Sequence, residues 1–295
     1  MNKQHDARAR AIRAMGNIFT PDVIGATLDL YAGELTADPR IECVADLAYG
    51  DEERQVLDLY LQADNRAGPL MLFVPGGGFD GGDKRVNDMV FGNVARWFAS
   101  KGVAGAVMNY RLAPGACWPA GALDVHSAVN WLRREAASLG FDPDQIWLVG
   151  HSAGANHVAT ALLDRSLAAE PAVRGAALIS GIYEPPRGDA PPGVVSYFGT
   201  DKDALEARSA LRWARAGSVP IMLAYAEHDA PWLSRPSLDL AAALTERDGK
   251  AARVFWMRDH NHVSPIFSIG SSDEALGLEL LDFMGHVPAM RGDAA

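Results

Sequence analysis

From residue 41 onward, short apolar runs alternate with helical patterns. Two of them, 70–74 and 103–108, are almost continuously apolar, which is typical of strands buried on both faces. We predict strands at 41–49, 54–62, 70–74, 103–108, 145–149, 175–180, 220–225 and 252–257, and helical patterns at 122–139, 153–165, 200–215, 236–247 and 273–284. This alternation predicts an α/β fold, a mostly parallel sheet flanked by helices. The short turn 50–53 predicts an antiparallel edge.

The first forty residues follow a different pattern. Ile12, Met15 and Phe19 recur at helical spacing, and Thr20-Pro21 is a plausible cap and first position for a second helix. We therefore expect residues 1–40 to form a small helical lid or packing arm, and residues 41–295 to form one large α/β domain.

Composition narrows the class of protein without deciding its function. A chain of 295 residues with 48% hydrophobic and 22% charged residues is ordinary for a globular domain. The net charge of −10 argues against a nucleic-acid partner. Because no apolar run approaches membrane-spanning length and the first residues are polar, we expect no membrane association and a cytoplasmic location.

Cysteine and histidine spacing indicates no bound cofactor. Cys43 and Cys117 are far apart and match no metal-ligand pattern, so we expect two buried thiols rather than a disulfide or a site. The close histidine pairs, at 260 and 262 and at 151 and 157, lack the accompanying ligands of a zinc motif. The sequence therefore implies no metal and no other cofactor.

A candidate nucleophile, Ser152, follows the strand predicted at 145–149. Residues 150–154 read Gly-His-Ser-Ala-Gly and lead into a predicted helix, which is G-x-S-x-G in its strand–turn–helix context. The sharp turn would lift the Ser152 hydroxyl above the sheet, and the helix N-terminus would favour a developing negative charge. A chance match in a Gly/Ala-rich chain is the alternative.

A glycine triplet, Gly76 to Gly78, directly follows the strand predicted at 70–74. The Lys-Ser/Thr pair of a phosphate-binding loop is missing, and the glycine spacing is wrong for a dinucleotide site. With Ser152 downstream, the triplet fits one half of an oxyanion hole, and the Ala153 N–H fits the other. A simple flexible turn remains the alternative.

Taken in order, these motifs resemble a known family. The glycine loop, Asn109 to Pro114, Trp118-Pro119-Ala120 and Gly150 to Gly154 resemble the hormone-sensitive-lipase-like and kynurenine-formamidase-like carboxylesterases, over about residues 55 to 285. The resemblance implies the α/β-hydrolase fold, with Gly77 and Gly78 as oxyanion donors. Where the family has a histidine before its glycines, this chain has Pro75, which lacks an N–H.

The resemblance also implies a structural role for Arg111, which we expect to form a buried ion pair with Asp124. Substrate binding by Arg111 is the less favoured alternative.

The acid and the base should follow Ser152 along the chain, in that order. The resemblance assigns Asp229 as the acid and His262 as the base. Glu227 is the rival acid, and His260 is the rival base two residues away. Asp239 is discounted because it falls inside a predicted helix.

The favoured function is hydrolysis of small to medium carboxylic esters through an acyl-enzyme on Ser152. An amidase or arylformamidase with the same triad is the nearest alternative, so the expected partner is a small-molecule ester or amide. An acyltransferase and a non-catalytic binding module are less favoured. An exposed edge strand makes a homodimer possible.

Overall fold

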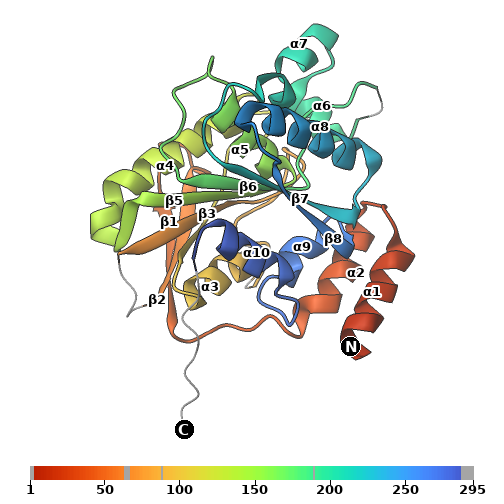
Figure 1. The fold of residues 1–295 in the computed structure, drawn as a ribbon. Helices are drawn as coiled ribbons and strands as arrows, with labels where there is room; N and C mark the ends of the chain where they lie inside the picture. The colour runs from red at the N-terminus through yellow and green to blue at the C-terminus, as the bar shows by residue number, and fades with distance from the viewer. Residues whose placement is uncertain (1–2, 63–66, 88, 189, 287–295) are drawn as a thin grey trace.

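One mixed sheet organises the fold. The computed structural model describes residues 3–62, 67–87, 89–188 and 190–286 (Figure 1). Within them, eight strands form a single sheet in the order β1-β2-β4-β3-β5-β6-β7-β8. The strands are β1 (Ile41–Ala48), β2 (Val56–Gln62), β3 (Gly68–Val74), β4 (Ala104–Met108), β5 (Phe141–His151), β6 (Gly175–Ile179), β7 (Ile221–His228) and β8 (Arg253–Asn261).

The predicted antiparallel edge is confirmed. Strand β1 pairs antiparallel with β2, and β2 pairs antiparallel with β4, whereas β4, β3, β5, β6, β7 and β8 run parallel. Because parallel strands end at the same edge of a sheet, the loops after β3, β5, β6, β7 and β8 all emerge together.

Helices cover both faces of the sheet (Figure 1). Leu70 and Leu72 of β3 belong to one buried cluster, and Met71 and Phe73 belong to another on the opposite face. This alternation confirms that the apolar run marks a strand buried on both sides. The first cluster packs beneath α4 (Ala120–Leu139), α5 (Ala153–Leu163) and α8 (Pro231–Asp248), and the second beneath α3 (Gly92–Ser100), α9 (Ser264–Ser268) and α10 (Ala275–Phe283).

Three helices differ from the pattern read along the sequence. Helix α3 was not predicted, because it is only nine residues long and begins at Gly92 without a side-chain cap, so the sequence signal for its start is missing. Helix α8 begins at Pro231 rather than near residue 236. Helix α6 (Pro192–Phe198) begins at the end of residues 184–193, whose Pro/Gly-rich sequence predicts a loop or linker. Both start with proline at the first helical turn, where its missing N–H has no cost.

The predicted helical excursion at 200–215 consists of two short pieces, α7 (Lys202–Ala207) and the 3₁₀ helix η1 (Ala210–Trp213). Throughout the described chain, no helix combines the length and the apolar character needed to cross a membrane.

Helices α1 (Lys3–Met15) and α2 (Pro21–Ala32) lie beside the end of β8 (Figure 1). The Thr20 hydroxyl caps α2 by accepting from Val23 N, as predicted, but Phe19 lies in the connection between the helices rather than in the first. The Arg13 guanidinium pairs with Asp259 at 2.8 Å, and Asn261 Nδ2 donates to Thr27 Oγ1 at 2.8 Å. Both contacts attach the helices to the end of β8.

The predicted ion pair between Arg111 and Asp124 is confirmed. Asp124 is fully buried and lies 2.7 Å from Arg111 Nη2. It also accepts from the Arg111 backbone N–H and from Gln55 Nε2, both at 2.8 Å. Several donors therefore compensate the buried charge.

The prediction of buried thiols is wrong. Cys43 and Cys117 are both unpaired and exposed. Cys43 lies on β1, the edge strand, and its side chain belongs to a largely solvent-facing run. Cys117 lies in the loop before α4, outside both clusters beneath the sheet.

His157 lies in the core, where its Nδ1 makes one long contact, 3.4 Å, with the Tyr197 hydroxyl. The His157 side chain, on α5, is completely buried, and its ring packs against Phe79, Tyr110 and Tyr197. Burial lowers the pKa of His157 to about 3. The folded protein therefore keeps this imidazole neutral between about pH 6.5 and pH 3, a range in which an exposed histidine is mostly protonated.

This burial predicts an acid-sensitive core. As pH falls below about 6.5, the unfolded chain protonates His157 but the folded chain does not, so stability is lost progressively toward the folded pKa. With a pKa of about 3, His157 should cost about 2 kcal/mol of unfolding free energy between pH 8 and pH 5. We expect His157→Phe to remove that part of the pH dependence in urea titrations at the two pH values. If the unfolding free energy of His157→Phe changes between the two pH values as much as that of the parent, the prediction is contradicted.

Candidate active site

Ser152 lies at the junction of β5 and α5 in a strained conformation. Its φ and ψ are 53° and −120°, which non-glycine residues rarely adopt and which cluster at functional sites. The Ser152 N–H donates to the Ile179 carbonyl at 2.9 Å, which ties the turn to the end of β6. The turn also needs glycine behind it, because a methyl group at Gly154 would lie 2.0 Å from the Val74 carbonyl oxygen.

His262 and Asp229 meet Ser152 in a continuous chain of hydrogen bonds. His262 is the first residue after β8, and Asp229 is the first after β7. His262 Nε2 lies 2.9 Å from Ser152 Oγ, and its Nδ1 lies 2.8 Å from Asp229 Oδ1. All three side chains are buried. The structure thus brings together the three residues that the sequence predicts as nucleophile, base and acid.

A fourth residue, Ser180, holds the acid in place. Its hydroxyl donates to Asp229 Oδ2 at 2.6 Å, and the Ala226 N–H donates to the same oxygen at 2.9 Å. Burial alone would raise the pKa of Asp229, but the hydrogen bonds and charge of His262, with those of Ser180 and Ala226, outweigh it and lower that pKa. Sequence reasoning missed Ser180. The available signal was a polar residue directly after a fully apolar strand.

The rival residues lie elsewhere. The imidazole of His260 contacts Ser264 Oγ at 2.9 Å and Asp273 at 3.2 Å, so both of its nitrogens are engaged away from Ser152. Glu227 is exposed and accepts from the Asp259 backbone N–H. Asp239 is exposed on α8.

The glycine loop lies against the candidate nucleophile, because β3 is the direct neighbour of β5. A methyl group at Gly76 would lie 3.1 Å from Ser152 Cβ. Gly77, with φ of 153°, lines the same cavity as Ser152, and Gly78 follows with φ of 65°. Ala153 begins α5, where a backbone N–H has no partner within the helix. Gly77 and Ala153 therefore lie beside Ser152, Gly78 is the next residue along the loop, and the role of all three toward an oxyanion stays a prediction.

His151 supports the base from behind. Its Nε2 donates to the His262 carbonyl oxygen at 2.8 Å, and the two rings lie 5.0 Å apart. Burial and the neighbouring His262 lower the pKa of His151 to about 3, so its imidazole is neutral and donates from one nitrogen. This contact fixes the backbone of His262. Sequence reasoning assigned His151 no role beyond its place in the motif.

An apolar cavity of about 190 Å³ opens beside Ser152. One wall comes from the N-terminal helices, another from residues before α3, and a third from α9. The Phe19 ring meets the His262 ring edge-on at 4.7 Å. The described lining of the cavity contains no Asp, Glu, Lys or Arg, and its one histidine, His151, is neutral: Phe19, Ile24, Leu28, Gly76, Gly77, Gly82, Val86, Val90, Phe91, His151, Ser152, Val263, Ile266 and Phe267.

A second cluster has the residue types of a metal site. Ligand atoms of Glu227, His228 and Asp259 lie within 4.8 Å of one another. The Asp259 carboxylate, however, already pairs with the Arg13 guanidinium at 2.8 Å. The expectation that no metal is needed stays a prediction.

Comparison with known proteins points to esterases. The BD-FAE family model matches residues 57–168, which include the glycine loop and Ser152. The esterase LipQ of Mycobacterium tuberculosis is 29% identical over 71% of this chain and 54% of its own length, so the chain spans about half of that relative. The kynurenine formamidase of Salmo salar is 27% identical over 83% of each chain.

Solved structures agree on the fold. Esterase B of Lactobacillus rhamnosis, crystallised with a tributyrin phosphonate inhibitor, superposes with a TM-score of 0.76 at 19% identity, covering 97% of this chain and 96% of that one. The resemblance inferred from the ordered motifs is thereby confirmed. The chain therefore has the α/β-hydrolase fold, and it is similar in sequence to the BD-FAE family over residues 57–168, to the esterase LipQ and to a kynurenine formamidase.

Proposed function

We propose that this protein is a serine carboxylesterase that hydrolyses small to medium esters through an acyl-enzyme on Ser152. The observation that carries the proposal is the buried chain from Asp229 through His262 to Ser152, with contacts of 2.8 and 2.9 Å, facing the glycine loop across an apolar cavity. The similarity to LipQ and to esterase structures supports the same reaction class.

The mechanism follows from the geometry. His262 Nε2 removes the proton from Ser152 Oγ as that oxygen attacks the ester carbonyl, and ionised Asp229 stabilises the resulting imidazolium. The backbone N–H groups of Gly77, Gly78 and Ala153 bind the tetrahedral oxyanion. His262 then protonates the departing alcohol. In the second half, His262 activates a water molecule that hydrolyses the acyl-enzyme and restores Ser152.

The cavity lining favours uncharged substrate groups. Because its described lining holds no charged side chain, a carboxylate or ammonium group placed there would lose hydration without gaining a partner. Val86, Val90 and Ile266 instead offer apolar surface to a short alkyl or aryl group. At about 190 Å³, the cavity is smaller than the pockets of about 300 Å³ and above that bind drug-sized ligands.

An arylformamidase is the second candidate, supported by the similarity to a kynurenine formamidase over 83% of both chains. The same triad can cleave an activated amide. A formyl group has a single carbon, however, and would leave most of an apolar acyl pocket unfilled. Turnover of matched acetyl, butyryl and octanoyl esters and an aryl formamide would separate the two candidates. Product analysis with an added alcohol would reveal an acyltransferase.

We also propose that α1 and α2 form a lid that selects substrates, with residues 41–295 as the catalytic domain. Phe19, Ile24 and Leu28 line the cavity, and Phe19 packs against the proposed base. Attachment of the helices to Asp259 and Asn261 makes this lid part of the pocket wall.

Removing the nucleophile should abolish the reaction. We expect Ser152→Ala to fold normally and to lose both ester hydrolysis and labelling by a fluorophosphonate, because no other hydroxyl contacts His262 Nε2 among the described residues. Mass spectrometry of the labelled parent should locate the adduct on Ser152. An unlabelled, inactive parent would favour a binding module, and labelling of another serine would overturn the assignment.

The two neighbouring histidines should differ strongly in effect. His262→Ala should lower kcat by about 10⁴-fold or more at neutral pH, as expected for loss of a general base. His260→Ala should stay within about a hundredfold of the parent, because its ring bonds to Ser264 and Asp273 instead. Steady-state kinetics on a butyryl ester measure both. If the larger loss follows His260, the base must be reassigned.

Shortening Phe19 should change acyl selection. We expect Phe19→Ala to raise kcat/KM for octanoyl relative to butyryl esters by about tenfold, because an opened wall admits a longer chain. Ile18→Ala is the matched control, since Ile18 is the adjacent apolar residue, is 58% exposed and does not line this cavity. If both substitutions change the ratio of octanoyl to butyryl kcat/KM equally, or if Phe19→Ala leaves it unchanged, the proposed lid role is wrong.

A further inference from the structure

The segment after the glycine loop folds back onto it. The Gly81 N–H donates to the Gly77 carbonyl oxygen at 3.0 Å, and a methyl group at Gly82 would lie 2.7 Å from the Gly76 carbonyl oxygen. Gly82 and Val86 also line the cavity beside Ser152. The position of residues 81–86 therefore affects both the oxyanion loop and one wall of the pocket.

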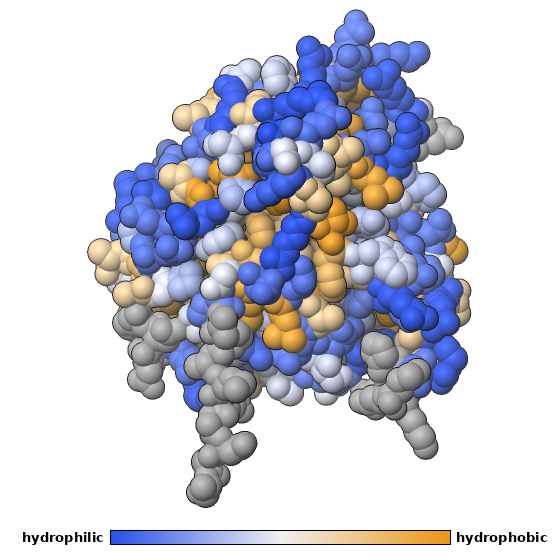
Figure 2. Space-filling model, in the orientation of Figure 1, coloured by the Kyte–Doolittle hydropathy of each residue, from blue (hydrophilic) through white to orange (hydrophobic). Residues whose placement is uncertain are grey.

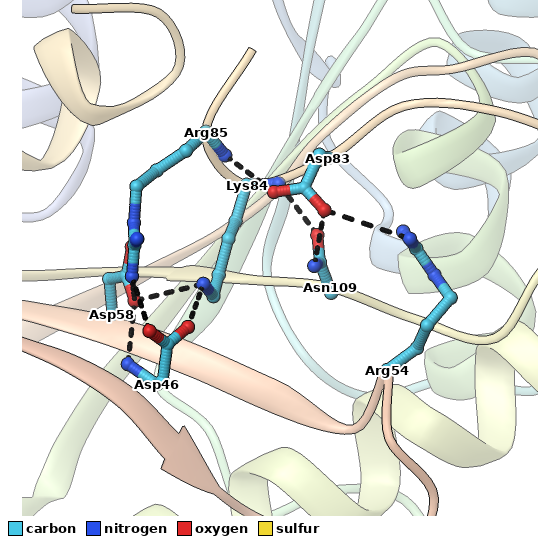
Figure 3. Close-up of polar contacts among 7 residues, drawn as sticks. All are labelled: Asp46, Arg54, Asp58, Asp83, Lys84, Arg85 and Asn109. Carbon is cyan, nitrogen blue, oxygen red and sulfur yellow. Dashed lines mark hydrogen bonds and ion pairs between the residues drawn. The ribbon is translucent and has the colours of Figure 1, made fainter. Parts of the chain in front are cut away.

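Four charged side chains hold this segment to the sheet (Figure 3). Asp58, in the middle of β2, has a fully buried side chain, and Lys84 is only 4% exposed. Lys84 Nζ lies 3.1 Å from Asp58 and 2.5 Å from Asp46. Arg85 contacts both oxygens of Asp58, at 2.5 and 2.9 Å, and reaches Asp46 at 2.9 Å. We call Asp46, Asp58, Lys84 and Arg85 the loop clamp.

Contacts made by Asn109 and Arg54 extend the clamp toward the loop (Figure 3). Asn109 accepts from the Lys84 N–H at 2.6 Å and donates to Asp83 at 2.8 Å. Arg54 Nη2 donates to the Gly82 carbonyl oxygen at 2.9 Å. Residues 82 to 85 are thus each held by at least one contact outside the segment.

The loop itself needs external support. Three consecutive glycines lose more conformational entropy on ordering than any other residues, and Pro75 before them has no N–H to donate. The Pro75 carbonyl oxygen accepts from the Tyr110 hydroxyl at 3.1 Å. A misplaced oxyanion donor loses most of its effect, because the stabilisation depends on preorganised geometry.

We propose that Lys84 and Arg85, held by Asp58 and Asp46, are positioning residues that keep Gly77 and Gly78 in place for the oxyanion and fix the adjacent pocket wall. The inference rests on the proposed esterase function. The strength of the clamp comes from the burial of Asp58, because buried ion pairs are costly to break whereas exposed pairs contribute little. Burial favours the neutral acid, but hydrogen bonds from Arg85, the Asp46 N–H and Lys84 outweigh it and lower the pKa of Asp58.

The test separates positioning from general stability. Arg85→Met removes the contacts to both carboxylates, and Arg85 is 41% exposed, so the variant should fold. We expect kcat/KM for a butyryl ester to fall about 10- to 100-fold. Affinity for a trifluoromethyl ketone, which forms an oxyanion on Ser152, should fall by the same factor. Affinity for the matching alcohol product, which forms none, should change less than about threefold, and Arg85→Lys should restore part of the activity.

Arg253→Met is the matched control, because Arg253 also bridges two carboxylates, Glu279 at 2.7 Å and Asp282 at 2.5 Å, away from the site. It should leave the kinetics unchanged. The inference is overturned if a folded Arg85→Met enzyme keeps its kcat/KM and ketone affinity, or if both variants lose activity in proportion to their loss of stability. A parent without ester turnover or phosphonate labelling would instead reject the proposed function, so the two failures are distinguishable.

Discussion

The site depends on one constraint: parallel strands end together at one edge of the sheet. Pro75, Ser152, Ser180, Asp229 and His262 are each the first residue after a strand, and those strands, β3, β5, β6, β7 and β8, are consecutive neighbours. Strands lie about 4.8 Å apart, so residues distant in sequence come within reach of short hydrogen bonds. The 2.8 Å contact between Asp229 and His262 joins adjacent strand ends, while His262 reaches back across the sheet to Ser152 at 2.9 Å.

Rigid strand ends alone do not hold a glycine loop. The family histidine is replaced by Pro75, and the loop is held by groups on both sides of it: the Tyr110 hydroxyl on the Pro75 carbonyl, and the buried charges of Asp58 and Lys84 behind residues 82–85. The antiparallel strands β1 and β2 contribute to this support, because they carry Asp46 and Asp58. Under this proposal, two residues at one edge of the sheet, Asp46 and Asp58, affect the reaction at Ser152 although they lie far from His262 in the sequence.

Sequence patterns predicted the features that depend on residues close together in the chain. The apolar runs located the strands, and the G-x-S-x-G turn located Ser152. These patterns did not predict α3, whose residues are nearly all buried. They also assigned no role to Ser180, His151 and Lys84, because the partners of these side chains lie 49, 111 and 26 residues away in the sequence. The spacing alone could not choose between His260 and His262, because that choice depends on the turn after β8. The family resemblance, rather than periodicity, selected His262.

The N-terminal helices are attached to the strand end that carries the proposed base, His262. Phe19 contacts the His262 ring, while Thr27 and Arg13 bond to Asn261 and Asp259 just before it. A helix that only covered the pocket would not need these polar attachments to the end of β8. Because Asn261 also accepts from the Ser264 N–H at 3.1 Å, the attachment extends into the turn that orients the imidazole. Moving these helices as a body would break the buried hydrogen bond between Asn261 and Thr27, next to the proposed base. We therefore infer that a substrate enters by local motion of Phe19, which is 50% exposed, rather than by displacement of the helices.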